Sequence, residues 1–505
     1  MNQLSVSPLE SSKRTAFNMI CNTATHFLSA VIAFIITPFL IARIGMEAYG
    51  FYPISAEIMT LFGLVPGIIN ATSGRYITVE EARGTGEEAS RYFSTVFFSN
   101  VGLCGILLFP MGLFVTFADR ILSVPEGYIG ELRVFFVLAL ASVLVNALVT
   151  AFGSAYMIAN RIDLRSGQEF IAVLLKAAVL FGLLGGGFSS SIVSVGIALL
   201  LSCLAGAVIQ ILMCRRLVPS LRLSVSLWSA HHARRVITSG FWYTLDRLGA
   251  FLMTGMLLLV SNVIFTAEGV GVYSVSVTAS RFLGGVLLML AGVLLPTTAK
   301  RFARGEDTLL CREVERNQKI TGYFASVGVA VGIGFFREFF SLWLGGEADP
   351  LLTPLAIISI LPMVAVATAL PLVDLGVVMD RMRRLSLLFV GCGLLTFAAV
   401  LIVATVTPFG TVGVAAVSCV AQLLWYAGLV PLFAGRILRV KARRFYVPVL
   451  RCLFACAVTT GLVFLIKNVA PIEGWTSFLV IVSMSATVSA VVNFLLVFGK
   501  PKFKM

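Results

Sequence analysis

Eight charged side chains lie inside long apolar runs of the sequence. They are four acids and four bases: Glu57, Asp246, Glu338 and Asp374, with Lys176, Arg247, Arg281 and Arg337. Arg337 and Glu338 are near the outer end of their predicted helix. A charge at the centre of a bilayer costs about 2.5–3.5 kcal/mol on insertion scales, so such a group normally faces a cavity or a partner of opposite charge. Arginine can bind phosphate oxygens with a planar fork of parallel hydrogen bonds. The pattern therefore predicts either an anion-binding cavity or charge pairs that hold helices together.

A second set of polar side chains is spaced by three and four residues, which places it on one face of a helix. The set comprises Asn18, Asn22, Thr25, His26 and Ser29, and a later helix carries Trp242 and Tyr243 beside Asp246. Because rings stack on sugar faces and amides bond to sugar hydroxyls, these residues are candidates for a sugar-binding cavity. The alternative is hydrogen bonding between helices, which small polar residues commonly provide in membranes. His26 is a candidate protonation switch, or else a packed polar residue.

The nine cysteines lie mostly in apolar runs and show no CxxC spacing for a metal. We expect no structural disulfide, no metal site and no catalytic residue. His231 and His232 are followed by two arginines, and we interpret them as a solvated strip that faces lipid headgroups. The expected cofactor is none, with a coupling ion, Na⁺ or H⁺, as the open alternative.

The composition indicates where these residues must lie. Only 12% of the 505 residues are charged and 58% are apolar, whereas soluble domains carry roughly 25% charged residues. Such a chain cannot cover a water-facing surface with polar groups. This excludes a soluble globular enzyme, a disordered chain and a nucleic-acid-binding protein. The net charge of +14 instead suits basic loops beside a membrane.

Fourteen apolar segments are long enough to cross a bilayer core as helices, which takes about 20 residues. They are 17–42, 48–74, 92–117, 132–159, 167–187, 191–213, 237–263, 270–298, 320–343, 352–378, 385–406, 411–434, 447–468 and 475–498. The sequence therefore predicts an all-α, polytopic membrane protein whose first helix is retained. Pro362 and Pro371, together with Asp374, indicate a broken helix within 352–378.

Basic residues are distributed unequally between the two sides of the predicted spans. With a cytoplasmic N-terminus, 30 of the 38 Lys and Arg residues lie on the cytoplasmic side and only four on the other. The positive-inside rule then predicts that both termini are cytoplasmic. Every outward loop is short, and we therefore predict that the protein is not an enzyme.

An internal repeat divides the predicted helices. The stretch 47–52 aligns with 268–273, each at the start of the second helix of a block. Transporters often contain such repeats, with the substrate path between the halves; chance similarity of apolar sequence is the alternative. The repeat predicts two six-helix bundles and a terminal helix pair. The predicted boundaries are an N-lobe at 1–213, a cytoplasmic linker at 214–236, a C-lobe at 237–434, and two helices with a basic cytoplasmic tail at 435–505.

The opening of the chain resembles that of polysaccharide flippases, in the multidrug/oligosaccharidyl-lipid/polysaccharide exporter superfamily. A polar first helix is followed by Ile44-Gly45, Ala48-Tyr49-Gly50-Phe51, a second helix that contains Gly and Pro, and Gly74-Arg75-Tyr76. As architecture the resemblance covers nearly the whole chain. It implies two bundles in a V around a central cavity, in the bacterial inner membrane.

For the polysaccharide branch, the resemblance also implies a function. Such a flippase moves an undecaprenyl-diphosphate-linked oligosaccharide from the cytoplasmic to the periplasmic leaflet by alternating access. The glycan would be destined for O-antigen lipopolysaccharide, capsule or exopolysaccharide, and a polysaccharide polymerase is a possible partner. In that architecture Arg247, Arg281 and Lys176 are the candidates for the diphosphate, unless the arginines pair with neighbouring acids. The candidates for ion coupling are Glu57, Asp246 and Asp374.

Two related transporters are the alternatives. Multidrug antiporters of the superfamily typically carry an acid in the first helix, where this chain has only His26 as a titratable group away from the ends. Lipid II flippases usually carry several arginines in their first two helices, where Glu57 is the only clear mid-membrane charge here. A membrane-embedded polymerase or ligase would need a sizeable outer loop. We therefore predict a flippase for lipid-linked oligosaccharides.

Overall fold

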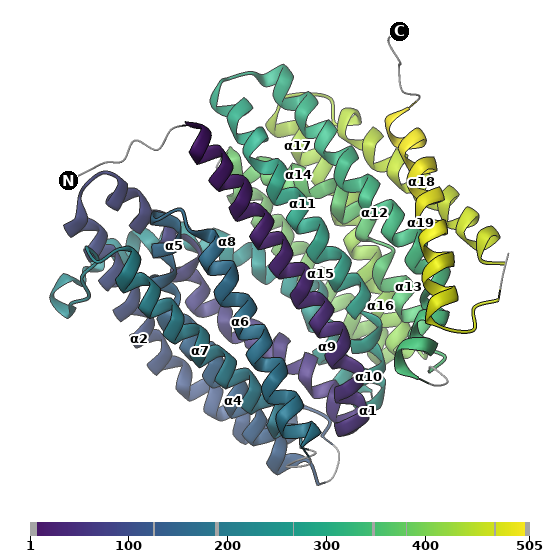
Figure 1. Cartoon of the computed structure of the whole chain (residues 1–505), viewed down its shortest axis with the longest axis horizontal. Helices are drawn as coiled ribbons and strands as arrows, with labels where there is room; N and C mark the ends of the chain where they lie inside the picture. The colour runs from purple at the N-terminus through teal and green to yellow at the C-terminus, as the bar shows by residue number, and fades with distance from the viewer. Residues whose placement is uncertain are drawn as a thin grey trace. The chain divides into compact units, whose positions relative to one another are not determined.

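The computed structural model describes residues 8–124, 127–186, 191–265, 267–345, 349–379, 381–468 and 471–499. In these ranges the chain forms helices and connecting turns, without a strand (Figure 1). Thirteen helical stretches are long and apolar enough to cross a membrane. One of them, Ile20–Ala82, consists of two helices that meet at Gly45, whose φ of 82° suits glycine. The predicted fourteen spans and the all-α polytopic class are confirmed.

The described chain forms two compact units, Met1–Phe251 (unit 1) and Leu252–Met505 (unit 2). Unit 1 contains α1 (Pro8–Ala82), α2 (Gly86–Thr116), α3 (Ala118–Ile121), α4 (Ile129–Val149), η1 (Thr150–Gly153), α5 (Ser154–Ile158), α6 (Ile162–Leu180), η2 (Phe181–Gly185), α7 (Val193–Leu217), η3 (Val225–Leu227) and α8 (Ala230–Ala250).

Unit 2 begins within η4 (Phe251–Gly255). It continues with α9 (Met256–Ile264), α10 (Ala267–Ser276), α11 (Thr278–Ala303), α12 (Asp307–Leu344), α13 (Leu352–Ile360), α14 (Met363–Val378), α15 (Met382–Val406), α16 (Gly410–Leu423), η5 (Leu424–Leu429), α17 (Val430–Ile437), α18 (Arg443–Lys467) and α19 (Trp475–Phe498). The helix break predicted at Pro362 is present between α13 and α14. The basic tail from residue 500 lies outside the described residues.

The boundary between the units differs from the predicted one, because α8 packs with unit 1. A Cβ atom on Gly240 would overlap the backbone carbonyl of Ile68, so α8 and α1 approach as closely as glycine allows. Thr72 Oγ1 lies 3.4 Å from the Val236 carbonyl and 3.0 Å from Ser239 Oγ. The sequence-based division starts the second bundle at 237, whereas contacts assign residues up to Phe251 to unit 1.

The terminal helices α18 and α19 are part of the core of unit 2. Phe335 of α12, Val463 of α18 and Phe478 of α19 belong to one buried cluster. Ser326 Oγ of α12 donates a 2.9 Å hydrogen bond to the Cys452 carbonyl of α18. These contacts make the terminal pair an integral layer of unit 2.

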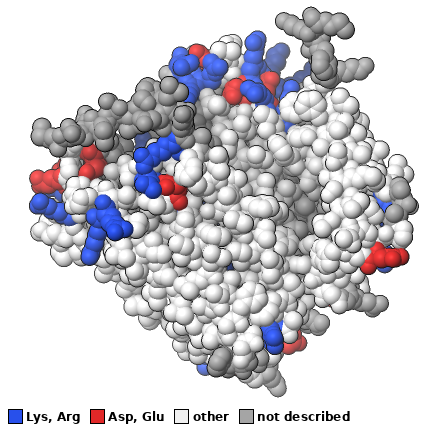
Figure 2. All heavy atoms as spheres, in the orientation of Figure 1, with Lys and Arg blue, Asp and Glu red and all other residues white. Residues whose placement is uncertain are grey.

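On the face shown in Figure 2, charged side chains gather towards the ends of the helices, and the broad surface between them is largely uncharged. Several helices extend further than the apolar pattern predicts, because their polar ends continue beyond the hydrophobic stretch. The α12 helix, for example, begins at Asp307, whereas the predicted span begins at residue 320. Its polar extension carries Glu315, which pairs with Arg444 at the start of α18.

Candidate functional site

Three residues of the polar stripe on the first helix bind α6. Asn18 Nδ2 donates to the Asn160 carbonyl at 3.2 Å, and Asn18 Oδ1 accepts from the N–H of Asp163 at 3.2 Å. Thr25 Oγ1 donates to the Ser166 carbonyl at 3.3 Å, and Ser166 Oγ lies 3.4 Å from Asn22 Oδ1. Asn22 and Thr25 therefore make the helix–helix contacts that the sequence left open as the alternative to sugar binding.

The other two residues of the stripe, His26 and Ser29, are less involved in helix packing. His26 is exposed and Ser29 is half-buried, and within the described ranges neither side chain makes a hydrogen bond. They lie C-terminal to the contacts with α6, on the same helix. Of the sugar candidates in the first helix, these two retain groups available to a ligand.

Lys176 joins α6 to the second half of α1. Its Nζ atom lies 3.5 Å from the hydroxyl of Tyr52, and the Tyr52 ring lies 6.3 Å from that of Tyr49. Lys176 and Glu57 are both half-buried in unit 1. A lysine held by a phenol keeps its charge available to an anion, because the phenol is a neutral partner.

The first half of the seventh span, α8, carries the next group of candidates. Trp242, Tyr243 and Asp246 are half-buried, whereas Arg247 is exposed. No ion pair between Asp246 and Arg247 occurs in the described chain, as expected for neighbours that point about 100° apart on a helix. Arg247 therefore presents a guanidinium group at the surface of unit 1.

Unit 2 carries the remaining two candidates. Arg281 of α11 is exposed, and Asp374 of α14 is half-buried, three residues after Pro371. Thr321 Oγ1 donates a 2.7 Å hydrogen bond to the Ala367 carbonyl, whose usual helical donor is missing because residue 371 is a proline. The Ala367 carbonyl, which Pro371 leaves without its helical donor, is thus bonded by α12. The diphosphate and ion-coupling roles of these residues remain predictions.

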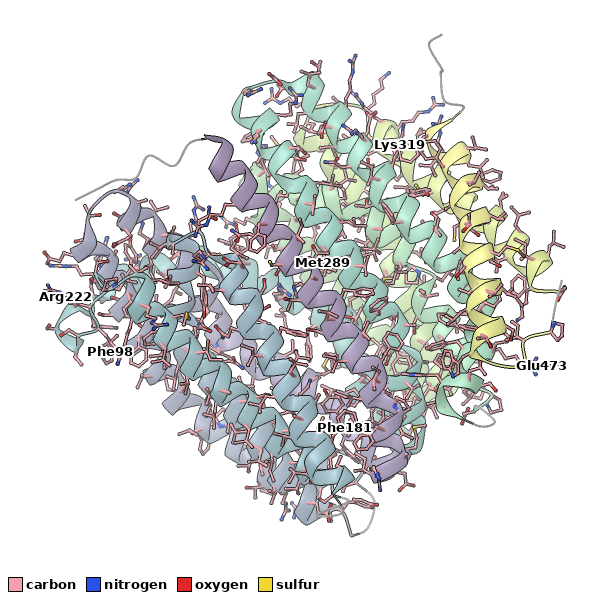
Figure 3. All side chains as sticks on the ribbon, in the orientation of Figure 1. Phe98, Phe181, Arg222, Met289, Lys319 and Glu473 are labelled. Atoms are coloured by element: carbon pink, nitrogen blue, oxygen red, sulfur yellow. The ribbon has the colours of Figure 1, made fainter. Side chains whose placement is uncertain are left out.

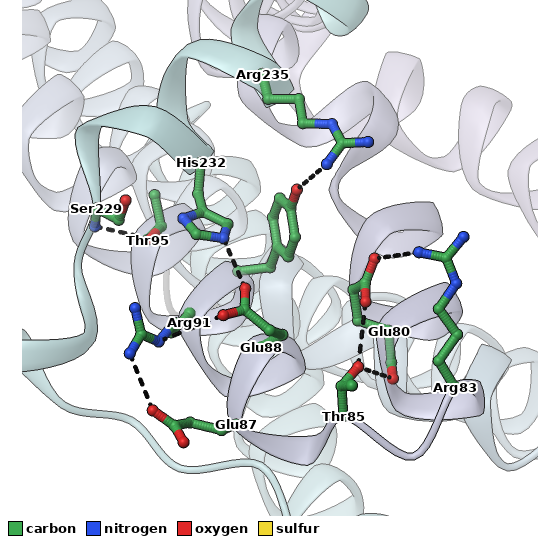
Figure 4. Close-up of polar contacts among 11 residues, drawn as sticks. Glu80, Arg83, Thr85, Glu87, Glu88, Arg91, Thr95, Ser229, His232 and Arg235 are labelled. Atoms are coloured by element: carbon green, nitrogen blue, oxygen red, sulfur yellow. Dashed lines mark hydrogen bonds and ion pairs between the residues drawn. The ribbon is translucent and has the colours of Figure 1, made fainter.

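Sequence reasoning missed an aromatic and charged cluster that joins α1, α2 and α8 (Figure 4). The rings of Tyr76 and Tyr92 stack with centroids 5.2 Å apart, and His232 packs edge-on against Tyr92 at 4.5 Å. Arg235 donates a 3.1 Å hydrogen bond to the Tyr92 hydroxyl, and His232 Nε2 lies 2.9 Å from Glu88 Oε2. The interpretation of His232 as solvated is wrong, since its side chain is only 12% exposed.

The predicted linker at 214–236 also contains an ordered segment. Residues 218–229, here called the strap, run along α2, and their backbone groups bind its hydroxyl side chains. The hydroxyls belong to Ser90, Ser94 and Thr95. The signal in the sequence is the run of Ser and Thr at intervals of four, one and four residues from 90 to 99. No group of three or more His, Cys, Asp or Glu side chains that could hold a metal occurs in the part of the chain that the structure describes.

The order and packing of the helices match those of solved membrane transporters. The chain aligns with a lipid II flippase, MurJ, in an inward closed conformation, with a TM-score of 0.68 and 13% identity over 94% of this chain and 99% of that one. It also aligns with the MATE multidrug transporter DinF-BH, with a TM-score of 0.64 and 16% identity over 86% of this chain and 96% of that one. An outward-facing MATE transporter of the MOP superfamily gives a TM-score of 0.61 over 85% of this chain. The protein is thus a multi-pass membrane protein with this transporter fold.

At the level of sequence, the chain is similar to the uncharacterized membrane protein EpsK of Bacillus subtilis (strain 168). The two are 22% identical over 490 residues, which is 96% of this chain and 95% of EpsK. No model of a protein family matches the sequence. The likeness runs almost from end to end of both chains.

Proposed function

We propose that this protein is a flippase that moves an undecaprenyl-diphosphate-linked oligosaccharide from the cytoplasmic to the periplasmic leaflet of the bacterial inner membrane. It works by alternating access, with both termini in the cytoplasm, and it carries out no covalent chemistry. The glycan unit would feed O-antigen, capsule or exopolysaccharide synthesis, in which a polymerase acts on the translocated product.

The observation that carries this proposal is the extent of the fold match to a flippase for a lipid-linked substrate. The alignment with the lipid II flippase spans 94% of this chain, including nearly all of the flippase. The MATE transporters align with 83–90% of it. The wider alignment supports the flippase over the drug exporter.

The basic side chains support a diphosphate as the recognised group. Arg247 is exposed on α8, Arg281 is exposed on α11, and Lys176 has the neutral Tyr52 hydroxyl as its neighbour. Guanidinium groups bind phosphate oxygens with parallel hydrogen bonds. We assign the diphosphate to these three residues, and the sugar to His26, Ser29, Trp242 and Tyr243. Asn22 and Thr25 contribute by fixing the first helix against α6.

Coupling to a Na⁺ or H⁺ gradient is part of the proposal, with Asp374, Asp246 and Glu57 as the groups that would bind the ion. The test is transport of a lipid-linked oligosaccharide by the full-length protein in proteoliposomes with imposed gradients. Asp374→Asn should abolish the response to the gradient while leaving the protein folded. Transport that is indifferent to both gradients would remove the coupling.

The decisive experiment measures lipid-linked intermediates in a strain that lacks this protein. Accumulation of an undecaprenyl-diphosphate oligosaccharide on the cytoplasmic leaflet, with loss of a surface polysaccharide, is the expected result. Normal surface glycan with altered drug sensitivity would favour a multidrug antiporter, and accumulation of lipid II would favour a peptidoglycan flippase.

Single substitutions test the diphosphate site in the same strain. Arg247→Ala and Arg281→Ala should abolish complementation while the protein remains in the membrane at normal abundance. Arg120→Ala, at the end of the helices predicted to face outward, is the matched control and should complement. Full complementation by both variants would show that the diphosphate assignment is wrong.

A further inference from the structure

The strap at residues 218–229 carries three large apolar side chains that are partly exposed. Leu223, Val225 and Trp228 are 43%, 71% and 47% exposed. The strap lies between the membrane spans that end at Leu217 and begin at Ala230. A turn that faces water is normally polar. Three exposed apolar side chains in a twelve-residue connection therefore indicate a surface that lipid or another protein covers.

The backbone of the strap is hydrogen-bonded to α2 along most of its length. Ser94 Oγ donates to the Arg222 carbonyl at 3.0 Å and accepts from the N–H of Ser224 at 3.2 Å. The N–H of Arg222 donates to Ser90 Oγ at 3.1 Å, and the N–H of Ser229 donates to Thr95 Oγ1 at 3.2 Å. Non-helical backbone near hydrocarbon requires such internal partners, since water is scarce there.

The position of these contacts on α2 shows the depth of the strap. The first two turns of α2 carry Glu87, Glu88 and Arg91, and from Tyr92 to Thr116 the helix has no charged residue. The hydroxyls of Ser94, Thr95 and Ser99 therefore lie where the helix changes from charged to apolar. The indole Nε1 of Trp228 donates to Ser99 Oγ at 3.2 Å. Tryptophan is enriched at this level of a bilayer, between headgroups and acyl chains.

The strap also has a basic border. Arg215, Arg216, Arg222 and Arg234 are all exposed, and no ion pair involves them in the residues that the structure describes. Figure 3 labels Arg222 on the strap and Phe98 on the adjoining part of α2. Unpaired arginines beside exposed apolar groups match the chemistry of an anionic lipid, which offers a phosphate above an acyl chain.

We propose that the strap is an interfacial anchor for anionic phospholipids. It lies in the headgroup region of the leaflet on the Lys- and Arg-rich side of the protein. Leu223, Val225 and Trp228 enter the upper acyl region, and the four arginines bind phospholipid headgroups. The hydroxyls of α2 hold the strap against that helix, with its apolar and basic groups towards lipid.

Tryptophan quenching in proteoliposomes tests the depth of the strap. The fluorescence of the full-length protein minus that of Trp228→Phe isolates the contribution of Trp228. Phospholipids brominated near the headgroup end of the acyl chains should quench this contribution, and aqueous acrylamide should not. Trp425→Phe is the control, because Trp425 is buried against Phe389 and its contribution should resist both quenchers.

Headgroup selection is tested with the same readout. Brominated phosphatidylglycerol should quench the Trp228 contribution more than brominated phosphatidylcholine at the same mole fraction. Arg222→Gln and Arg234→Gln should each weaken this preference roughly fivefold, whereas Arg120→Gln should leave it unchanged.

Three results would overturn the proposal. Quenching by acrylamide but not by brominated lipid would place Trp228 in water. If acrylamide quenches Trp228 in proteoliposomes but not in native membrane vesicles, a protein partner covers the strap instead of lipid. Equal quenching by the two brominated headgroups would refute the selection of anionic lipid.

Discussion

Replacing Gly240 with alanine should separate α8 from α1. An ideal Cβ atom at position 240 would lie 3.0 Å from the carbonyl carbon of Ile68 and would overlap its oxygen. Carbon atoms in contact are about 3.5–4.0 Å apart, so one helix must move by roughly 1 Å. Because the obstacle is backbone rather than the end of a flexible side chain, rotamer changes cannot relieve it.

The expected cost follows from two contributions. Overpacking of this kind costs about 1–3 kcal/mol. The displacement also stretches the contacts of Thr72 with Val236 and Ser239, which are 3.4 and 3.0 Å long and are worth about 1 kcal/mol each. Alanine regains about 1 kcal/mol of helix propensity. The net expectation is a loss of about 2–4 kcal/mol in the free energy of unfolding.

The assay is thermal unfolding of the purified full-length protein in detergent, with abundance in the membrane as a second readout. Gly67→Ala is the matched control, because its Cβ would meet only Thr244 Oγ1, at an ordinary 3.7 Å. Gly240→Ala should lower the melting temperature, and Gly67→Ala should leave it equal or higher. Equal melting temperatures for the two variants would refute the reasoning.

Two further predictions concern hydrogen-bonded groups away from that interface. Lys467 Nζ lies 2.7 Å from Glu338 Oε1 and 3.0 Å from the Gly334 carbonyl, and both charged side chains are 21% exposed. Lys467→Met should therefore lower the free energy of unfolding by about 2–3 kcal/mol, measured by thermal unfolding. Adding Glu338→Gln to this variant should restore part of the lost stability. A double variant no more stable than Lys467→Met would contradict the ion pair. Ser94→Ala should cost about 1–3 kcal/mol and speed hydrogen exchange at residues 222–224. Ser202→Ala is the control, because the Ser202 hydroxyl bonds to its own helix, and it should not change that exchange. Unchanged exchange at residues 222–224 in Ser94→Ala would refute the contact between the strap and α2.

Hydropathy by itself determined the number of spans and the fold class. A helix in lipid must hydrogen-bond its own backbone, so about 20 apolar residues specify a span without reference to any partner. The break at Pro362 was likewise predictable, since proline lacks the N–H group that a helix needs. These features depend on a few neighbouring residues along the chain, which is why the sequence was sufficient.

The tertiary structure decided which face of each helix meets which neighbour. The stripe of Asn18, Asn22 and Thr25 has the same spacing whether it faces a ligand or α6. Only the position of the carbonyls of Asn160 and Ser166 shows that the stripe packs. In the same way, α8 belongs to unit 1 because Gly240 allows a close approach to Ile68, residues far apart in sequence. Periodicity is a local property, whereas the choice of partner depends on shapes and hydrogen-bonding groups that only folding brings together.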